Sequence, residues 1–502
     1  MKRFLAFLIS LTLLALCGCG GNNAEPSGVP SAEETAEESS AEEAPEYAIV
    51  FYRFYADEAD RMAAKVKELT GKEIQVIKYG QNSQMPAHAV YIGEVTDGVG
   101  SELCKASRGM DYGIKPQNGS VYIYGGSRDA VTKAAEYFMS EFITENGVNT
   151  DTEYVYTHDY PLAGASVCGV PLSEYTVVYS ATTNEAKYSD VANEIKQYLK
   201  ENADRSPTVA PATRAETEYE LLLGSETGRQ AGKGLYESKF EYDAYRIIID
   251  GTKIAIVGGN ACAVWHGFLA LCSAVAENGG NIGETTIDGR CRLVKVACVG
   301  GSITEGSNSK DPDKTYPNFL QKMLGYDYLV KNYGIGGYSV VNSDVYAYTK
   351  HWKYTTSVKF VPDVVIWMLG INDGNPSQDY KAWEGTNRLE KYIQSAEMMF
   401  SAYEKVNPDV QIFVTLPSSL FKSDVWTEWK EWGARVEKYV IPLNRELAEK
   451  HGYPVIDVFT WANGHPEVFP DGLHPEDDAY KTYAKRVYDE IYGVIKTPED
   501  LG

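Results

Sequence analysis

The sequence predicts an α/β protein in which a C-terminal domain with a parallel sheet follows two duplicated small α+β domains. A chain of 502 residues has room for about three domains. In its last two-fifths, apolar β-branched runs precede amphipathic stretches, a pattern typical of buried parallel strands joined by helices. In the region before it, one succession of strand and helix patterns occurs twice. The predicted segments are an export signal (1–19), a linker (20–46), two repeat domains (47–160 and 161–290) and the C-terminal domain (291–495).

The first 19 residues have the pattern of an export signal. Met1–Arg3 is basic, and the apolar run Phe4–Leu16 is too short to span a bilayer as a mature helix. Cys19 follows Gly18 and resembles the processing site of a bacterial lipoprotein, so we expect a lipid anchor on Cys19. This anchor would attach the protein to the extracellular face of the cytoplasmic membrane. Cleavage of the signal alone would instead release the protein.

The predicted linker, residues 20–46, is acidic and expected to be disordered. It has seven glutamates between Gly21 and Ala44 and no aromatic or basic residue. Such a segment cannot bury enough apolar surface to fold, and repulsion between its charges extends it. Behind a lipid anchor, it would hold the folded domains away from the membrane.

The charge of the chain indicates which partners it can bind, and its cysteines indicate whether disulfide bonds are expected. The chain has 47 basic and 70 acidic residues and a formal net charge of −23, which argues against a nucleic-acid partner. Six cysteines follow the export signal, most of them in apolar strand or helix contexts, and we expect buried thiols rather than a disulfide framework. They are Cys104, Cys168, Cys262, Cys272, Cys291 and Cys298.

The two repeat domains share their sequence pattern at intervals of about 130 residues. The matching segments are Tyr47–Phe51 with Tyr175–Tyr179, His88–Gly93 with Tyr219–Gly224, and Gly119–Gly126 with Gly251–Gly259. We expect three or four strands and two helices in each copy. The paired glycines before a helix could bind phosphate, but a tight connection from hairpin to helix is favoured. The second copy resembles the small α/β domain that precedes the catalytic barrel of several bacterial glycoside hydrolases. Neither copy has an evident acid–base pair, so both are expected to act as scaffold or to present substrate.

Ser302 lies between a predicted strand, Leu293–Val299, and a predicted helix, Tyr316–Leu324. A serine in such a turn exposes its hydroxyl at the carboxyl edge of the sheet, beside free backbone N–H groups. The hydroxyl needs a base to become a nucleophile. Among the seven histidines, His474 alone has an acidic residue, Asp471, three positions upstream. On an extended turn, Asp471 can hold one ring nitrogen while the other faces the serine.

Four sequence blocks, in order, resemble those of the SGNH/GDSL hydrolase superfamily. They are Gly300–Ile303, Asn332–Ser339, Pro362–Asp373 and Asp471–Pro475. The resemblance covers residues 291–495 and implies a flavodoxin-like, three-layer α/β/α fold with a five-stranded parallel sheet. The strands are expected near 293–299, 328–331, 364–369, 411–415 and 455–458, with the site at their carboxyl edge.

The resemblance also implies roles for individual residues. Ser302, His474 and Asp471 would form the catalytic triad. The backbone N–H groups of Ser302 and Gly337 and the side-chain amide of Asn372 would bind the oxyanion. Tyr338, next to the oxyanion glycine, is expected to touch the substrate.

Several residues typical of related or alternative hydrolases are missing from the sequence. The first block lacks the aspartate that often precedes the serine in this superfamily, so any role of that aspartate cannot be transferred. The Gly-x-Ser-x-Gly turn of α/β-hydrolases is absent, because Thr304 occupies the position of its second glycine. Without a His-Glu-x-x-His motif or paired Cys-x-x-Cys motifs, we expect no metal and no cofactor.

The favoured activity is removal of acetyl or other short acyl groups from a polysaccharide or oligosaccharide. Export, the glycosidase-like accessory domain and the many tyrosines and tryptophans support this substrate class. Trp426, Trp429 and Trp432 recur every third residue and are expected near one side of a helix, where they could stack on sugars or pack the helix against a neighbouring domain. The alternatives are a lipid-directed esterase or thioesterase, a sugar O-acyltransferase, and a surface carbohydrate-binding protein with an inactive hydrolase domain.

Overall fold

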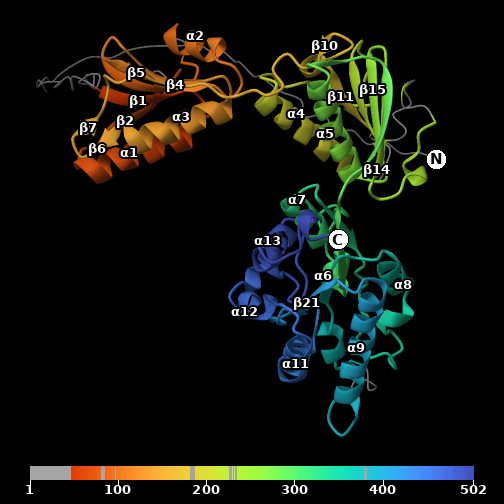
Figure 1. Ribbon diagram of the computed structural model, residues 1–502. Coiled ribbons are helices and arrows are strands. Elements are labelled where there is room, and N and C mark those ends of the chain that lie inside the picture. Colours follow the sequence, from red (N-terminus) through yellow and green to blue (C-terminus); the bar gives the residue numbers. More distant parts are fainter. Residues whose placement is uncertain are drawn as a thin grey trace, which may run out of the picture.

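The structure is a computed structural model that describes residues 47–80, 85–95, 98–180, 187–224, 229, 231, 234–377 and 382–501. Figure 1 shows three successive α/β units, two towards the N-terminus and one formed by the C-terminal part of the chain. The predicted signal peptide with Cys19 and the predicted acidic linker lie outside the described residues. None of the helices in the described part is long and apolar enough to cross a membrane.

The first unit is a six-stranded sheet with helices on both faces. Its elements are β1 (Tyr47–Phe51), α1 (Ala56–Thr70), β2 (Gln75–Lys78), β3 (His88–Ile92), α2 (Val99–Ala106), β4 (Tyr112–Gln117), β5 (Ser120–Gly125), α3 (Arg128–Glu141) and β8 (Tyr154–Tyr156). The strand order is β2-β1-β3-β5-β4-β8, parallel up to β5 and antiparallel from there to β8. Helices α1 and α3 pack together on one face, and α2 contacts β5 from the other (Figure 1).

The second unit has a sheet of the same topology. Its elements are β11 (Thr176–Tyr179), α4 (Lys187–Asn202), β12 (Val209–Pro211), β13 (Glu220–Leu223), β14 (Ala244–Asp250), β15 (Lys253–Gly258), α5 (Ala261–Glu277) and β17 (Thr285–Arg290). The order β12-β11-β13-β15-β14-β17 matches that of the first sheet strand for strand, with the same parallel and antiparallel pairings. Two small strand groups lie outside these sheets. One pairs β6 (Ile143–Thr144) with β7 (Gly147–Val148), and the other joins β9 (Ser166–Val167), β10 (Val170–Pro171) and β16 (Asn281–Ile282).

The expectation of three or four strands per unit was wrong, because each sheet has six. The extra strands are short or partly exposed edge strands, whose mixed composition gives a weak hydrophobic pattern. The paired glycines form close backbone contacts. A Cβ atom on Gly126 would collide with the carbonyl group of Arg108, and one on Gly259 with that of Glu241. This crowding agrees with a tight connection from hairpin to helix.

The C-terminal unit contains the predicted five-stranded parallel sheet. Its strands are β18 (Val294–Gly300), β19 (Tyr328–Asn332), β20 (Val364–Met368), β21 (Gln411–Leu416) and β22 (Val455–Asp457). The order β19-β18-β20-β21-β22 is the flavodoxin-like order, in which the chain leaves the first strand in two directions. The buried apolar runs therefore gave the strand positions to within about two residues.

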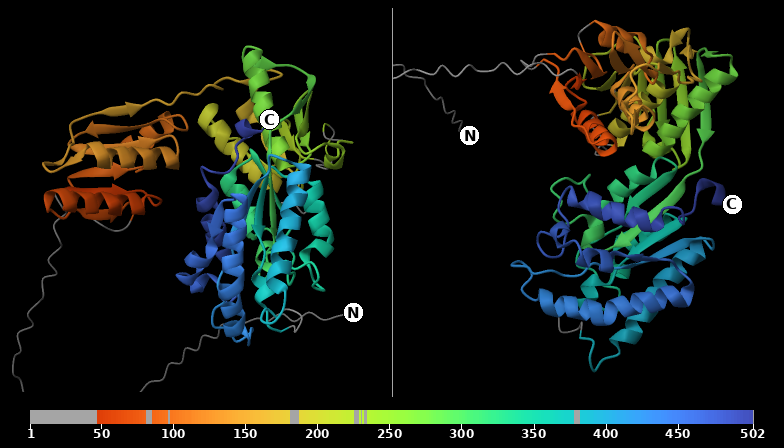
Figure 2. Two further views of the ribbon diagram at one scale, coloured as in Figure 1. Left: turned by 60° about the horizontal axis from the view of Figure 1, so that its bottom comes forward. Right: turned by 90° about the vertical axis from the view of Figure 1, so that its left-hand side faces the viewer.

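Helices cover both faces of this sheet. They are α6 (Ser302–Glu305), α7 (Tyr316–Leu324), α8 (Trp352–Lys359), α9 (Arg388–Val406), α10 (Trp429–Arg435), α11 (Ile441–His451), α12 (Val458–Asn463) and α13 (Ala479–Ile491). Helices α7 and α13 pack together on one side, and α8, α9 and α11 lie on the other (Figure 2). Every residue of the central strand β20 is buried as a result.

The amino edge of this sheet faces the second unit. The Cys262 thiol in α5 donates to the carbonyl oxygen of Tyr328, the first residue of β19, at 3.2 Å. The ring of Tyr242 meets that of Phe360, just before β20, with 5.4 Å between centroids. The carboxyl ends of the strands therefore point away from the second unit, as the right-hand view of Figure 2 shows.

All six predicted thiols are free cysteines in the structure. Cys104, Cys262, Cys272 and Cys298 are buried, and Cys291 is partly buried. Cys168 is exposed, contrary to expectation, because it lies in the turn between β9 and β10 with a positive φ of 49°.

Candidate active site

Ser302 is positioned by a turn that has no room for side chains. Strand β18 ends at Gly300, and Ser302 is the first residue of α6. A Cβ atom on Gly300 would collide with Oγ1 of Thr304 and lie 2.8 Å from the carbonyl oxygen of Met368. Glycine therefore lets the chain turn sharply at the sheet edge, and the serine side chain follows directly.

Ser302, His474 and Asp471 form a continuous chain of hydrogen bonds. His474 Nε2 lies 2.8 Å from Ser302 Oγ, and His474 Nδ1 lies 2.8 Å from Asp471 Oδ2. A carboxylate only accepts hydrogen bonds, so Nδ1 carries the proton and Nε2 is left to accept from the serine hydroxyl. Ser302 is only 8% exposed and His474 6%, which keeps bulk water away from this contact. The three predicted triad residues thus lie together in the geometry of a nucleophile, base and orienting acid.

The turn that contains Asp471 also keeps this carboxylate ionised. Burial favours the neutral acid, but the hydrogen bond from the His474 ring and those from the backbone N–H groups of His474 and Leu473 outweigh it. Together they hold the pKa of Asp471 well below its usual range. The negative charge beside Nδ1 is therefore present across the neutral and moderately acidic range.

The segments that carry the predicted oxyanion donors adjoin the serine turn. A Cβ atom on Gly301 would lie 3.1 Å from Asn372 Nδ2, so the amide of Asn372 directly adjoins the serine turn. A Cβ atom on Gly336 would lie 3.4 Å from Ser302 Cβ, which brings the loop of Gly337 to the same place. Gly337 has a positive φ of 80°, a conformation that glycine adopts without strain. The N–H group of Ser302, in the first helical turn, has no partner inside the helix.

Two side-chain contacts fix these donors, and neither was evident from the sequence. Asn372 Nδ2 donates to the carbonyl oxygen of Tyr338 at 3.1 Å, which joins the Asn372 turn to the Gly337 loop. Glu305 in α6 accepts from the backbone N–H of Gly336 at 2.9 Å. The serine helix, the glycine loop and the asparagine turn are therefore linked directly.

The expected tryptophan row does not exist, because Trp426 precedes helix α10, which begins at Trp429. Ser423 Oγ accepts from the backbone N–H of Val425 and of Trp426, so this part of the chain forms a turn rather than a helix. The indole of Trp426 instead donates to Asp471 Oδ2 at 3.3 Å, and its ring lies 5.7 Å from that of His474. Trp432 is buried within the C-terminal unit, where its indole donates to the carbonyl oxygen of Ile371 at 2.6 Å.

Tyr338 lies beside the site within a row of aromatic rings. Its ring centroid is 5.8 Å from that of Tyr346 and 5.1 Å from that of His351. The ring of His351 in turn lies 5.5 Å from that of Trp352, the first residue of α8. Tyr346 is 50% exposed and Trp352 is 64% exposed.

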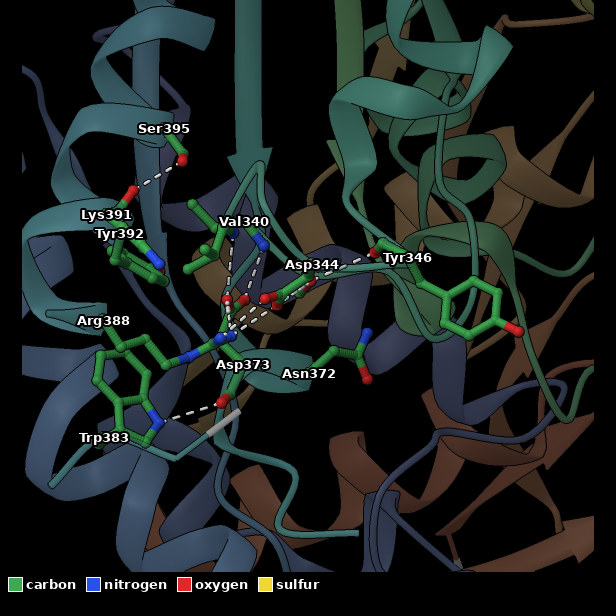
Figure 3. A network of polar contacts seen from close by, with 12 residues as sticks. Val340, Asp344, Tyr346, Asn372, Asp373, Trp383, Arg388, Lys391, Tyr392 and Ser395 are labelled. Carbon is green, nitrogen blue, oxygen red and sulfur yellow. Dashed lines mark hydrogen bonds and ion pairs between the residues drawn. The ribbon is translucent and has the colours of Figure 1, made fainter. Parts of the chain in front are cut away.

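A buried ion cluster beneath these loops was also missed by the sequence analysis. Arg388, at the start of α9, pairs with Asp344 in the loop after Gly337 and with Asp373 next to Asn372 (Figure 3). The one signal in the sequence was the position of Asp373 directly after the predicted oxyanion asparagine. Within the described part of the chain, no group of three or more histidine, cysteine, aspartate or glutamate side chains could hold a metal ion.

A comparison with known families agrees with this geometry. Residues 298–482 match the model of the GDSL-like Lipase/Acylhydrolase family. The C-terminal region is a GDSL-like lipase/acylhydrolase domain. The family predicted from the four sequence blocks is thereby confirmed for this part of the chain.

Individual proteins resemble the same region. An acetylxylan esterase of Xylanibacter ruminicola is 29% identical over 204 residues, which are 38% of this chain and 42% of that protein. The chain thus matches less than half of the length of this relative. Among solved structures, a carbohydrate acetylesterase family member from Sinorhizobium meliloti is 20% identical and covers 39% of this chain and 96% of its own, with a TM-score of 0.32. A lipase/acylhydrolase from Enterococcus faecalis is 19% identical and covers 41% and 98%, with a TM-score of 0.31.

Proposed function

We propose that the GDSL-like domain is a serine esterase that removes acetyl or other short acyl groups from a polysaccharide or oligosaccharide. The observation that carries this proposal is the hydrogen-bonded chain from Asp471 through His474 to Ser302. The Gly337 loop and the Asn372 amide, which the proposal takes as oxyanion donors with the Ser302 N–H, lie beside this serine. A buried serine with its hydroxyl on a neutral imidazole nitrogen is suited to attack on an ester carbonyl.

Hydrolysis then follows two steps. Ser302 Oγ bonds to the acyl carbon while its proton passes to His474 Nε2, and the carbonyl oxygen becomes an oxyanion held by the N–H groups of Ser302 and Gly337 and the amide of Asn372. The bond from the acyl carbon to the sugar oxygen breaks, and His474 protonates that oxygen. Water attacks the acyl-serine by the same route, which releases the carboxylic acid and restores Ser302. Asp471 stabilises the imidazolium in both steps.

Two observations favour an acylated carbohydrate as the substrate. The relative from Xylanibacter ruminicola is named an acetylxylan esterase. The rings of Tyr338, Tyr346 and Trp352 lie next to the oxyanion loop, and the latter two offer wide exposed faces. The apolar faces of sugar rings stack on aromatic side chains of this kind.

Acetate release from natural polymers tests the proposal. The fragment from residue 47 onward would be incubated with acetylated xylan, acetylated mannan, acetylated peptidoglycan and 4-nitrophenyl esters of short and long acyl chains, with Ser302→Ala as control. We expect serine-dependent acetate release from one of the polysaccharides. Turnover of only the nitrophenyl esters would reject the carbohydrate substrate, and preference for long acyl chains would favour a lipid-directed esterase. Transfer of acetate to an added sugar in place of water would identify an acyltransferase.

The aromatic row provides a second test of the substrate class. Trp352→Ala and Tyr346→Ala should raise KM for the polysaccharide severalfold and leave turnover of 4-nitrophenyl acetate unchanged, because one aromatic contact contributes about 0.5–1.5 kcal/mol. Trp461→Ala, whose ring packs on His465 and Phe469 instead, is the matched control. An equal effect on both substrates would place the row outside the sugar site.

Attachment to the membrane through Cys19 is part of the same proposal. The basic start, the short apolar run and the small residue before Cys19 support it. The full chain expressed in a bacterial host should fractionate with membranes and carry a lipid on Cys19 by mass spectrometry. Cys19→Ala should abolish both. A wild-type protein that is soluble and processed elsewhere would contradict the anchor.

A further inference from the structure

The ion cluster of Arg388, Asp344 and Asp373 lies wholly inside the protein. Arg388 donates to both oxygens of Asp344 at 2.9 and 2.8 Å and to Oδ1 of Asp373 at 2.9 Å. The side chains of Arg388, Asp344 and Asp373 are 4%, 3% and 0% exposed. A planar guanidinium suits this task, because its fork can bind one carboxylate with two bonds and reach another.

The two carboxylates hold the backbone of the loop that contains the oxyanion glycine (Figure 3). Asp373 accepts from the backbone N–H groups of Val340 at 2.8 Å and Val341 at 3.3 Å, three and four residues after Gly337. Asp344 accepts from the hydroxyl of Ser339 at 2.7 Å. The loop is thus tied down from both sides immediately after Gly337.

The same cluster also fixes the second donor, the side-chain amide of Asn372. Asp373 follows Asn372 in one short turn, Ile371–Gly374, so a backbone shift at Asp373 also displaces Asn372. The indole of Trp383 donates to the carbonyl oxygen of Asp373 at 3.1 Å and holds this turn from behind. Arg388 lies over the Trp383 ring, with its guanidinium carbon 5.3 Å from the ring centroid.

Charge explains why the cluster can hold only one arrangement. Two carboxylates and one guanidinium lie out of water, and each ionic group needs its partners to remain buried at acceptable cost. Burial works against the guanidinium charge, but the two carboxylates outweigh it and raise the pKa of Arg388. A displaced loop would leave a buried charge without its partner, so alternative loop positions are disfavoured.

We propose that Arg388, Asp344 and Asp373 are positioning residues that set the spacing between the Gly337 N–H group and the Asn372 amide. This inference rests on the proposed esterase function. None of the three residues needs to touch the substrate. They act on the rate through the donors that they hold, because a misplacement of about 1 Å at a catalytic site can cost about 10²-fold in rate.

A double-mutant cycle tests the inference. Arg388→Lys keeps a positive charge but loses the fork, and would be compared in the wild-type and Asn372→Ala backgrounds. We expect kcat for 4-nitrophenyl acetate to fall about 10–100-fold with KM within about twofold, because the loss affects the transition state. In the Asn372→Ala background the same substitution should lower kcat by no more than about 3–10-fold, because one of the positioned donors is already absent.

Arg445→Lys is the matched control, because Arg445 pairs with Asp457 at 2.9 Å on the surface of the same domain. It should leave kcat unchanged. If Arg388→Lys does not fold, Asp344→Asn, which keeps one acceptor oxygen and removes the charge, enters the same cycle. Equal losses in both backgrounds, or a lower Tm with unchanged kcat, would overturn the inference.

A fluorophosphonate probe separates this inference from the proposed function. Phosphonylation of Ser302, followed by mass spectrometry, needs the oxyanion donors but no sugar. If the probe labels the wild type and Arg388→Lys at the same rate, the positioning role alone is overturned. A wild type that neither hydrolyses the ester nor reacts with the probe would reject both.

Discussion

The same type of turn joins a strand to a helix in each of the three α/β units, and the position of its polar residue relative to the helix start differs. Gly125-Gly126-Ser127, Gly258-Gly259-Asn260 and Gly300-Gly301-Ser302 each join a strand to a helix. Ser127 Oγ accepts from the backbone N–H of Ala130 at 3.3 Å, and Asn260 Oδ1 from that of Ala263 at 3.1 Å. Both side chains are N-caps and are occupied by their own helix.

Ser302 comes one position later in its helix. Gly301 is the N-cap and Ser302 the first helical residue, so its hydroxyl does not cap the helix and meets His474 instead. A shift of one residue therefore separates a structural serine from a candidate nucleophile. Paired glycines and a polar residue are not evidence of catalysis until the helix start is known.

The largest effect should come from removing the two comparable serine hydroxyls. Ser302→Ala should lower kcat for 4-nitrophenyl acetate by at least about 10⁴-fold, because the nucleophile is lost. Ser127→Ala makes the same chemical change in the first N-terminal unit and should leave kcat within about twofold. Stopped-flow assays of both variants would measure this. Comparable losses would show that the comparison between the turns is wrong.

The second effect concerns Asp471, which has no counterpart at the two capping turns. Asp471→Asn should lower kcat by about 10⁴-fold, because an amide at this place favours the wrong tautomer of His474. Its folded pKa lies below the unfolded value of about 3.9, so the carboxylate stabilises the fold above that pH and loses this effect as the pH falls through the folded pKa. Urea unfolding should show wild type more stable than the variant at pH 7 and a narrower gap below about pH 4. A gap that stays constant down to pH 3 would contradict this.

Asn372→Ala should have the third largest effect, about 10²–10³-fold on kcat with little change in KM, because the amide acts on charge that develops in the transition state. Steady-state kinetics on one short acyl ester would separate the two parameters. Asn444→Ala removes another buried asparagine of the same domain, one that bonds Thr415, Tyr392 and Leu369 rather than any predicted site residue, and controls for general damage. A rise in KM alone would assign Asn372 to ground-state binding.

The smallest effects concern the free energy of unfolding and should distinguish the two capping side chains, Ser127 and Asn260, from Ser302. Ser127→Ala and Asn260→Ala should each lower the free energy of unfolding by about 1 kcal/mol, because each leaves a helix N–H group without its acceptor. Ser302→Ala removes no cap and should cost less. Denaturant titrations of the three variants would test this, and an equal loss for Ser302→Ala would assign it a capping role.

The sequence was sufficient for the C-terminal sheet and for the residues that bond directly to Ser302 through His474. Buried parallel strands such as β20 are continuous apolar runs, which are easy to locate. Asp471 and His474 were predicted to act with Ser302 because they are three residues apart, a spacing that one turn can bring to a serine. The candidate oxyanion residues came from the family resemblance, and the structure brings their segments next to one another.

Long-range contacts were beyond the sequence. Arg388, Asp344 and Asp373 follow no spacing rule, and an arginine at the start of a helix is usually a solvated surface residue. The position of Trp426 was misjudged because periodicity cannot show whether a helix has already begun, and here Ser423 holds a turn before it. The edge strands of the N-terminal units were missed because partial exposure removes the apolar pattern.

The contact between Trp426 and the triad gives the active site an optical signal of its own. Its indole N–H donates to the same oxygen of Asp471 as His474 Nδ1, and the two rings lie 5.7 Å apart. Because the indole shares this carboxylate with His474, the surroundings of the Trp426 ring should change when Ser302 is acylated, and its fluorescence emission should change with them. A difference spectrum against Trp426→Phe would then report acyl transfer on a natural polymer that carries no chromophore.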